Sequence, residues 1–415
     1  MGDHRAVAAG AEDVLASAGS CQGFAAADFQ RVADAFASNF DARGEQGASV
    51  CIYRAGRLVV DMWGGMVDAA AGSAWQPETV SLVFSATKAA TALCIHLLAD
   101  RGEVDIDRPV AAYWPEFAQN GKAHTSIRMV LDHTAGLPAL RDEMKADCLT
   151  DHDYMVRMIG RAAPEWEPGS RTAYHPLIGG FILAEIVRRV DGRSLGMFFA
   201  DEIARPLDLD FWIGLPEAEE ARVAPILSYR SPKDARPTRF SQAVREAGTL
   251  QNLFFFNHGD WQTRGMNTRV GRASEIGAAG GITNASSLAR LYAALVPDGP
   301  LGLSEETLAG FSQASSATHL DGMLLQPTRF GPGFMLRMDN RSNGRGNSLL
   351  IGPQAFGHVG AGGSVGFYDP DARLAFAYTM NRMGPGFLVN ERGQSLIDAA
   401  YECIVDRGFQ EVINP

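Results

Sequence analysis

The sequence is poor in cysteine. Its five cysteines are odd in number and none lies in a C-x-x-C motif, which indicates a reducing compartment and small buried side chains rather than a disulfide framework. The histidines show no H-x-H, H-x-x-x-H or H-E-x-x-H spacing, so we expect no metal ion and no cofactor. The cysteines are Cys21, Cys51, Cys94, Cys148 and Cys403.

Positive charge and long apolar runs are also scarce. Lysine and arginine number 37 against 48 acidic residues, and the net charge of −11 disfavours nucleic acid and anionic membranes as partners. No apolar run approaches the ~20 residues of a membrane span. The first 20 residues contain Asp3, Glu12 and Asp13 and no apolar signal-peptide core. We therefore expect a cytoplasmic protein, and nothing in the sequence indicates its oligomeric state.

The two ends of the chain mirror each other. Helical spacing over residues 24–44 is followed by two β-branched and aromatic runs around Gly56, which predict a hairpin. Near the other end, a strand, a turn and a strand over residues 363–382 precede a helical pattern over residues 388–408. Both ends are therefore predicted to contribute to one antiparallel sheet flanked by helices.

The remaining sequence completes an α+β prediction. The middle of the chain is mostly helical, with a long polar segment that is typical of functional loops. We expect a flexible leader over 1–22, an α/β domain from 23–84 and 325–415, and an inserted, mainly helical domain with long active-site loops over 85–324.

The stretch "SLVFSATKAATALCIHLLADRG" places Ser85 three residues before Lys88, at the start of an apolar helical pattern. The helix start favours a developing negative charge, and the apolar helix lowers the pKa of Lys88 toward that of a usable base. A serine beside a base is the general form of an activated nucleophile. The alternative is a chance S-x-x-K match in which Ser85 caps the helix.

Two further motifs follow in order. "RTAYHPLIGG" places Tyr174 before a helix, and "GHVGAGGSVGF" places a glycine-rich turn at the C-terminal hairpin. This arrangement resembles the serine β-lactamase and penicillin-binding-protein superfamily, whose elements are S-x-x-K, a Tyr or Ser motif, and K-T-G. Residues 102–138, ending in "HTAGLP", and residues 267–295 also resemble that superfamily, particularly its family VIII carboxylesterases. The resemblance covers residues 25 to 405.

The resemblance implies a β-lactamase-like fold and a role for each motif residue. Ser85 would be the nucleophile and Lys88 its proton acceptor. Tyr174 would share the base role, protonate the leaving group or activate water. The oxyanion hole would consist of the backbone N–H groups of Ser85 and Ala361, because Ala361 follows "HVG" as the residue after K-T-G does.

Two departures from the β-lactamase motifs bear on the substrate. The Tyr motif reads Tyr174-His175-Pro176 where class C β-lactamases have Tyr-Ala-Asn, and His358 replaces the lysine of K-T-G. The missing amide and the missing fixed cation shift the prediction from β-lactams toward uncharged esters. We expect His358 and Gly360 to contact the substrate; the alternatives for His358 are a plain hydrogen-bond donor or a packed residue.

Other residues invite catalytic interpretations that we weigh against packing. Two G-x-S-x-G matches centre on Ser364 and Ser194; no histidine follows His358, and Ser194 is interpreted as a helix N-cap. His96 is expected to be a core residue and His133 to fix a turn. Among the loop aromatics, Phe254 and Trp261 are candidates for lining an acyl pocket, with core packing as the alternative.

The expected function is a serine carboxylesterase that acts on a small-molecule ester through an acyl-enzyme on Ser85, and the resemblance implies short-chain carboxylic esters as substrates. The same machinery could serve a β-lactamase, a D-amino-acid peptidase, a hydrolase of small amides such as 6-aminohexanoate dimers, or an acyltransferase. A non-catalytic binding relative with the same fold is the alternative of another class. The reactive residue types at all three motif positions count against that alternative.

Overall fold

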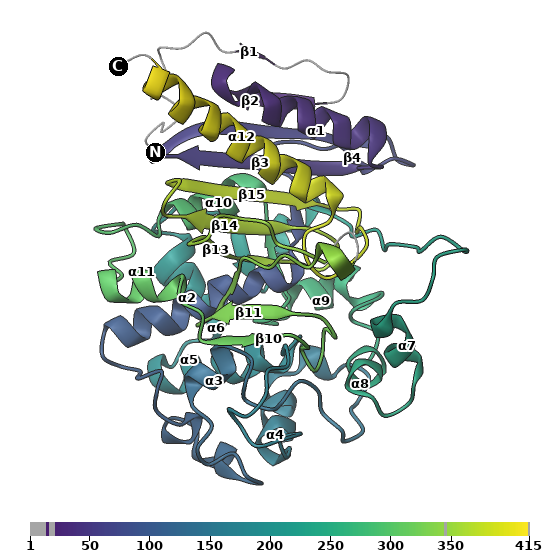
Figure 1. The fold of residues 1–415 in the computed structure, drawn as a ribbon. Coiled ribbons are helices and arrows are strands. Elements are labelled where there is room, and N and C mark those ends of the chain that lie inside the picture. Colours follow the sequence, from purple (N-terminus) through teal and green to yellow (C-terminus); the bar gives the residue numbers. More distant parts are fainter. Residues whose placement is uncertain (1–13, 16–20, 344–346, 414–415) are drawn as a thin grey trace.

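The computed structural model describes residues 14–15, 21–343 and 347–413, and Figure 1 traces them from purple to yellow. The leader expected over residues 1–22 lies largely outside this part of the chain. Of its residues, Val14–Leu15 form strand β1, and the leader's last two residues belong to strand β2, Cys21–Ala25.

An 11-stranded antiparallel sheet is the main layer of the molecule. Its order is β1-β2-β4-β3-β15-β14-β13-β12-β11-β10, with β5 beside β4. The remaining strands are β3 Gly47–Arg54, β4 Arg57–Asp68, β5 Ser73–Ala74, β10 Ser316–Thr318, β11 Thr328–Gly331, β12 Phe334–Leu336, β13 Phe356–Val359, β14 Val365–Asp369 and β15 Leu374–Met380.

The two ends of the chain meet at the pairing of β3 with β15. Ile52 lies opposite Phe376, and Cys51 lies opposite Ala377. The predicted hairpins on either side, β3–β4 and β14–β15, are both present. The expected antiparallel sheet built from both termini is therefore confirmed. The sheet continues to β10, whose residues lie in the part of the sequence expected to be helical.

Helices cover both faces of this sheet. Ile52 and Phe376 pack on the face covered by α1, Gln30–Ala42, and α12, Glu391–Ile413. Their neighbours in the two strands face the other core, which contains α10, Ala285–Ala293. Because both faces are buried, β15 is apolar along nearly its whole length, without a polar face. Figure 1 shows α1 and α12 together at the top of the molecule.

The mainly helical part lies on the far side of α10, and α2, Thr87–Asp100, crosses its core. Every residue of α2 from Thr87 to Leu98 is buried, which explains the uncharged run in the sequence. The other helices are α3 Ile127–Leu131, α4 His152–Arg161, α5 Ile178–Asp191, α6 Leu195–Phe199, α7 Arg239–Arg245, α8 Leu250–Phe256, α9 Arg269–Ala273 and α11 Glu305–Phe311.

A small second sheet leads into α2. Its order is β7-β9-β6-β8, formed by Phe211–Ile213, Gly281–Thr283, Val80–Leu82 and Val223–Ala224. A 3₁₀ turn, η2, over Phe84–Ala86 connects β6 to α2. The predicted nucleophile therefore lies on a short turn held between a sheet and a buried helix.

Candidate active site

Ser85 lies at the centre of η2 and is partly exposed. The residue before it, Phe84, has φ of +46°, a left-handed conformation that a non-glycine residue adopts at a cost of about 1–3 kcal/mol. Thr87 holds this turn, because its hydroxyl donates to the Phe84 carbonyl at 2.5 Å and accepts from the Gly281 N–H at 2.8 Å. The strained backbone thus presents the Ser85 hydroxyl at a fixed place.

Lys88 is one turn further along and is buried. Its Nζ lies 3.2 Å from Ser85 Oγ, and it donates to the carbonyl oxygens of Pro176 at 2.9 Å and Ala278 at 2.8 Å. Pro176 precedes α5 and Ala278 precedes β9, so three separate segments surround the amine. The structure therefore brings Ser85 and Lys88 together as the S-x-x-K spacing predicts.

Burial lowers the pKa of Lys88 well below its usual 10.5, and the described residues show no carboxylate that offsets this effect. A neutral amine has two N–H groups and one lone pair. The carbonyls of Pro176 and Ala278 can take both N–H groups, which leaves the lone pair directed at Ser85 Oγ. This is the arrangement that a general base for the serine hydroxyl requires.

Tyr174 completes the group. Lys88 Nζ lies 4.7 Å from the centre of the Tyr174 ring. Burial raises the pKa of Tyr174 above its usual 10, an effect that the nearby Ser85 hydroxyl partly offsets and Asp321 increases. No hydrogen bond of ordinary geometry joins the buried Tyr174 Oη to another described residue. The raised pKa keeps the phenol protonated, and its hydroxyl faces Ser85, where it could also meet a substrate.

Asp321 was not found by sequence reasoning. It is fully buried, and its two carboxylate oxygens accept from the Tyr174 N–H at 3.1 and 3.0 Å. It also accepts from the N–H groups of Met323 and Leu324 and from the Thr328 hydroxyl. Asp321 therefore fixes the backbone of the Tyr motif, and nothing near it in the sequence signals that role.

Three buried histidines surround the tyrosine and the lysine. The His133 ring centre lies 4.7 Å from that of Tyr174, and the His133 Nδ1 accepts from the His175 N–H at 3.2 Å. The His175 Nε2 accepts from the Leu137 N–H at 3.3 Å. Burial and the nearby lysine lower the pKa of all three imidazoles, to about 3 for His175 and His358. They are therefore neutral at physiological pH.

His358 supplies no charge at the place of the K-T-G lysine. It is buried, its Nδ1 lies 2.8 Å from the Val359 carbonyl oxygen, and its ring centre is 6.2 Å from that of Tyr174. The Nε2 atom has no hydrogen-bond partner among the described residues. A role for His358 in contacting substrate stays a prediction, and any such contact would be made by a neutral group.

The turn after β13 brings Gly360 against the backbone that leads into η2, and Ala361 follows it in the chain. A Cβ atom at Gly360 would lie 2.1 Å from the Val83 carbonyl oxygen, so only glycine permits this approach. The Gly360 N–H donates to the Ser364 carbonyl at 2.7 Å, and the Gly363 N–H donates to the Gly360 carbonyl at 3.1 Å. The Ala361 N–H has no such backbone partner in the described chain. Its role in an oxyanion hole stays a prediction.

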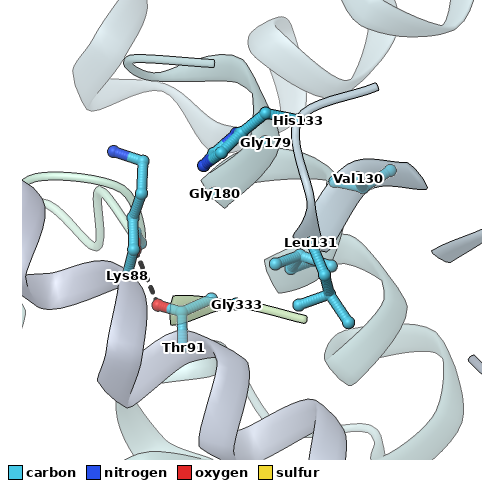
Figure 2. A pocket seen from close by; sticks show the side chains of 10 residues that line it. Lys88, Thr91, Val130, Leu131, His133, Gly179, Gly180 and Gly333 are labelled. Carbon is cyan, nitrogen blue, oxygen red and sulfur yellow. Dashed lines mark hydrogen bonds between the residues drawn. The ribbon is translucent and has the colours of Figure 1, made fainter. Parts of the chain in front are cut away.

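A small cavity of about 20 Å³ lies beside Lys88, and Figure 2 shows side chains that line it. That volume suits about one water molecule. Its lining is largely apolar, which accounts for the loss of solvation around the lysine side chain. It is lined by Lys88, Thr91, Val130, Leu131, His133, Gly179, Gly180, Leu183, Gly277 and Gly333. None of the loop aromatics contributes to it.

The remaining candidates lie elsewhere. Trp261 is buried and its Nε1–H donates to the Gly271 carbonyl at 3.3 Å, while Phe254 is half-buried against the ring of Phe255. Their part in an acyl pocket stays a prediction. Ser194 caps α6 by accepting from Met197 N–H, as expected for an N-cap.

His96 and Ser364 are both buried. His96 is a core residue whose Nε2 lies 2.9 Å from the Pro332 carbonyl oxygen, which confirms that expectation. Ser364 is fully buried in the turn that precedes β14. Neither residue therefore competes with Ser85 as a partly exposed nucleophile.

Comparison with known proteins identifies the family. A family model described as Beta-lactamase matches residues 32–401. The chain belongs to the beta-lactamase family. Esterase/beta-lactamase LipL of Mycobacterium tuberculosis is 35% identical over 414 residues, which cover 94% of this chain and 91% of LipL. Both the predicted resemblance and the β-lactamase-like fold are confirmed.

Two solved structures are similar to this chain over most of its length. A family VIII carboxylesterase is 34% identical with a TM-score of 0.78, over 92% of this chain and 99% of the esterase. A penicillin-binding-protein homologue from Caulobacter crescentus is 33% identical with a TM-score of 0.81, over 92% and 99% of the two chains. The protein is a serine hydrolase of the β-lactamase fold. Across the described residues, no helix is long and apolar enough to span a membrane.

Proposed function

We propose that this protein is a serine carboxylesterase that hydrolyses short-chain carboxylic esters through an acyl-enzyme on Ser85. One observation carries the proposal: Lys88 Nζ is buried, held by two carbonyls, and lies 3.2 Å from Ser85 Oγ. This geometry suits a neutral amine that removes a hydroxyl proton. The names of LipL and of the family VIII carboxylesterase support ester hydrolysis.

Acylation begins with proton transfer from Ser85 to the Lys88 amine as Ser85 Oγ bonds to the ester carbonyl carbon. The carbonyl oxygen becomes an oxyanion, which the N–H groups of Ser85 and Ala361 stabilise. The bond from carbon to the leaving oxygen then breaks. The leaving alcohol takes up the proton from Lys88 by way of the Tyr174 hydroxyl, and the acyl group stays on Ser85.

Deacylation runs through the same groups in reverse. A water molecule takes the place of the alcohol, donates its proton toward Tyr174 and Lys88, and attacks the acyl carbon. The carboxylic acid leaves and Ser85 regains its proton. If an alcohol or amine replaced the water, the same steps would give acyl transfer.

Lys88 and Tyr174 have different roles because their environments move their pKa values apart. Burial lowers the pKa of Lys88 and raises that of Tyr174, so both groups are favoured in their neutral forms. We therefore assign the base role to the lysine amine. Tyr174 relays the proton as a neutral phenol, and this assignment refines the shared base role that the motif alone suggested.

The electrostatics of the site favour an uncharged substrate. His358 is neutral, because its pKa lies at about 3, so no fixed cation stands where the K-T-G lysine would bind a carboxylate. Pro176 offers only its backbone carbonyl, and that carbonyl is already bonded to Lys88. Short esters of simple alcohols need neither a fixed cation nor a side-chain amide for binding. β-Lactam hydrolysis is the second candidate, because the name of LipL joins both activities.

Hydrolysis of p-nitrophenyl esters with acyl chains of increasing length, beside nitrocefin, tests the proposal in wild type and in Ser85→Ala. The expected result is rapid cleavage of the shortest esters, slow nitrocefin turnover, and loss of both in the variant. Nitrocefin turnover faster than ester turnover would favour the second candidate. Failure of a fluorophosphonate probe to label Ser85 would favour a non-catalytic binding protein.

A further inference from the structure

The turn that carries Ala361 is held from outside by a side chain that no motif identifies. Asn390 is buried, and its Nδ2 donates to the Gly362 carbonyl oxygen at 2.7 Å. The Gly384 N–H donates to the same oxygen at 2.8 Å. A Cβ atom at Gly363 or at Gly384 would lie 2.3 or 2.4 Å from Asn390 Nδ2, so both positions need glycine to admit the amide.

The other half of the Asn390 amide faces helix α12. Its Oδ1 accepts from the N–H of Arg392 at 3.1 Å, and the Asn390 carbonyl accepts from the Gln394 N–H at 2.9 Å. Asn390 therefore caps the start of α12. The amide orientation is fixed chemically, because one end meets an N–H donor and the other meets a carbonyl acceptor.

Arg392 holds this helix start in place. Its guanidinium donates to the buried Glu45 at 2.6 Å and to the Arg382 carbonyl oxygen at 2.6 Å. Glu45 is also bonded to the Tyr378 hydroxyl on β15. The beginning of α12 is therefore attached to the main sheet through buried polar contacts, and Asn390 cannot move independently of it.

Hydrogen bonds continue from Asn390 through two peptide units to the predicted oxyanion hole. The Gly362 carbonyl, which accepts from Asn390, belongs to the same peptide unit as the Gly363 N–H. That N–H donates to the Gly360 carbonyl, which belongs to the same peptide unit as the Ala361 N–H. In a planar trans peptide unit the C=O and N–H bonds point in opposite directions. The bond to the Gly360 oxygen therefore directs the Ala361 N–H away from Gly363.

The direction of this chain of bonds is electrostatically favourable. The start of a helix carries partial positive charge. From there, each amide N–H in the chain donates to the next carbonyl in the direction of Ala361. Aligned hydrogen bonds polarise one another, which strengthens the last donor. The last donor here is the Ala361 N–H, and the group it would meet in an ester reaction is an oxyanion.

We propose that Asn390 is a positioning residue of the oxyanion hole, which fixes and polarises the Ala361 N–H through the Gly362 and Gly360 carbonyls. The inference rests on the proposed function, since it takes Ala361 to face the reacting carbonyl. Asn390 itself touches no substrate. It acts at a distance through the two peptide units.

The substitutions Asn390→Asp and Asn390→Ser test this role. Both residues keep an oxygen that caps α12, and both remove the Nδ2 donor. Complete removal of an oxyanion donor costs about 10²- to 10³-fold in kcat, so a donor left in place without its support should cost about 10- to 100-fold. Three readouts are compared: kcat and KM on a p-nitrophenyl ester, affinity for a phenylboronic acid, and the rate of fluorophosphonate labelling of Ser85.

The proposal predicts that both variants lower kcat with little change in KM, and that labelling rate and boronic acid affinity fall in parallel. The boronate and phosphonate adducts place an oxygen where the oxyanion forms, so a purely structural role would not move them together. Asn284→Ser is the matched control, because Asn284 caps α10 by accepting from the Ser287 N–H at 2.8 Å. It should lower the melting temperature similarly and leave kcat within about twofold.

Unchanged labelling and kcat in both Asn390 variants would overturn the proposal, as would an equal loss in the Asn284 control. The proposed function can fail separately. If wild type cleaves no ester but its Ser85 is labelled, the labelling rates still decide the role of Asn390. If wild-type Ser85 is not labelled at all, both proposals are wrong.

Discussion

The carbonyl oxygen of Pro176 accepts a hydrogen bond from Lys88 Nζ at 2.9 Å. The contact is made by backbone, so it does not depend on which side chain stands at the third position of the Tyr motif. A proline there also removes one N–H that would otherwise need a partner in this buried place. The departure from Tyr-Ala-Asn therefore keeps the backbone hydrogen bond to Lys88. It removes the side-chain amide that a substrate would otherwise contact.

Lys88→Met should reduce kcat/KM for esters by about 10²- to 10⁴-fold, the range expected for loss of a general base. Labelling of Ser85 by a fluorophosphonate should slow as well. Lys122→Met is the matched control, because Lys122 is also buried and donates to three carbonyls, those of Gln119, Gly160 and Ala162. It should lower stability and spare activity; equal losses of kcat/KM in the two variants would contradict the base role.

The pH dependence of kcat/KM should show one rise, with an apparent pKa well below 10.5. Lys88 must lose its proton to act, and burial lowers its pKa. The same shift affects stability, because the unfolded chain binds this proton more tightly than the folded one does. The free energy of unfolding of wild type relative to Lys88→Met should therefore rise with pH up to about 10.5. Urea titrations at pH 7, 8.5 and 10 measure it; a difference that falls with pH would refute the neutral amine.

Tyr174→Phe should lower kcat by about 10²-fold or more with little change in the melting temperature. The buried Tyr174 Oη has no partner of ordinary geometry among the described residues. Its removal therefore leaves no buried donor or acceptor without a hydrogen-bond partner. Tyr292 serves as the control for a buried phenol away from Lys88, since its hydroxyl interacts with the His358 backbone. Tyr292→Phe should retain full ester activity. A large loss of stability in Tyr174→Phe would show that the phenol is structural.

Acid should destabilise the protein through its buried imidazoles. The pKa of His358 is about 3 in the folded protein and about 6.5 when unfolded, so its stabilising effect is complete above pH 6.5 and is lost as pH falls toward 3. At pH 5 this amounts to up to about 2 kcal/mol, from about 1.4 kcal/mol per pH unit. His358→Gln should flatten the fall in unfolding free energy between pH 7 and 5 relative to wild type. Identical slopes in wild type and His358→Gln would show that folding does not lower the pKa of His358.

Sequence patterns predicted those site residues that lie at a fixed, short spacing in the chain. Ser85 and Lys88 are one helical turn apart, so their contact follows from local geometry, and the paired hairpins follow from β-branched runs around turns. Tyr174 could be placed only by resemblance, because its approach to Lys88 depends on how distant segments pack.

Other parts of the site had no signal in the sequence. The carbonyls of Pro176 and Ala278 hold Lys88, and a backbone carbonyl is present in every residue. Asp321 and Asn390 act on segments far from them in the chain, at 147 and 28 residues. Their roles depend on tertiary contacts, which no local pattern records.

The most direct test of the account is to trap the acyl-enzyme. Wild type is mixed with p-nitrophenyl butyrate, quenched in acid within the burst phase, and its peptides are analysed by mass spectrometry. The account predicts a butyryl group on the peptide that contains Ser85, formed at the burst rate and absent in Ser85→Ala. A butyryl group on another residue, or undiminished hydrolysis by Ser85→Ala, would contradict it.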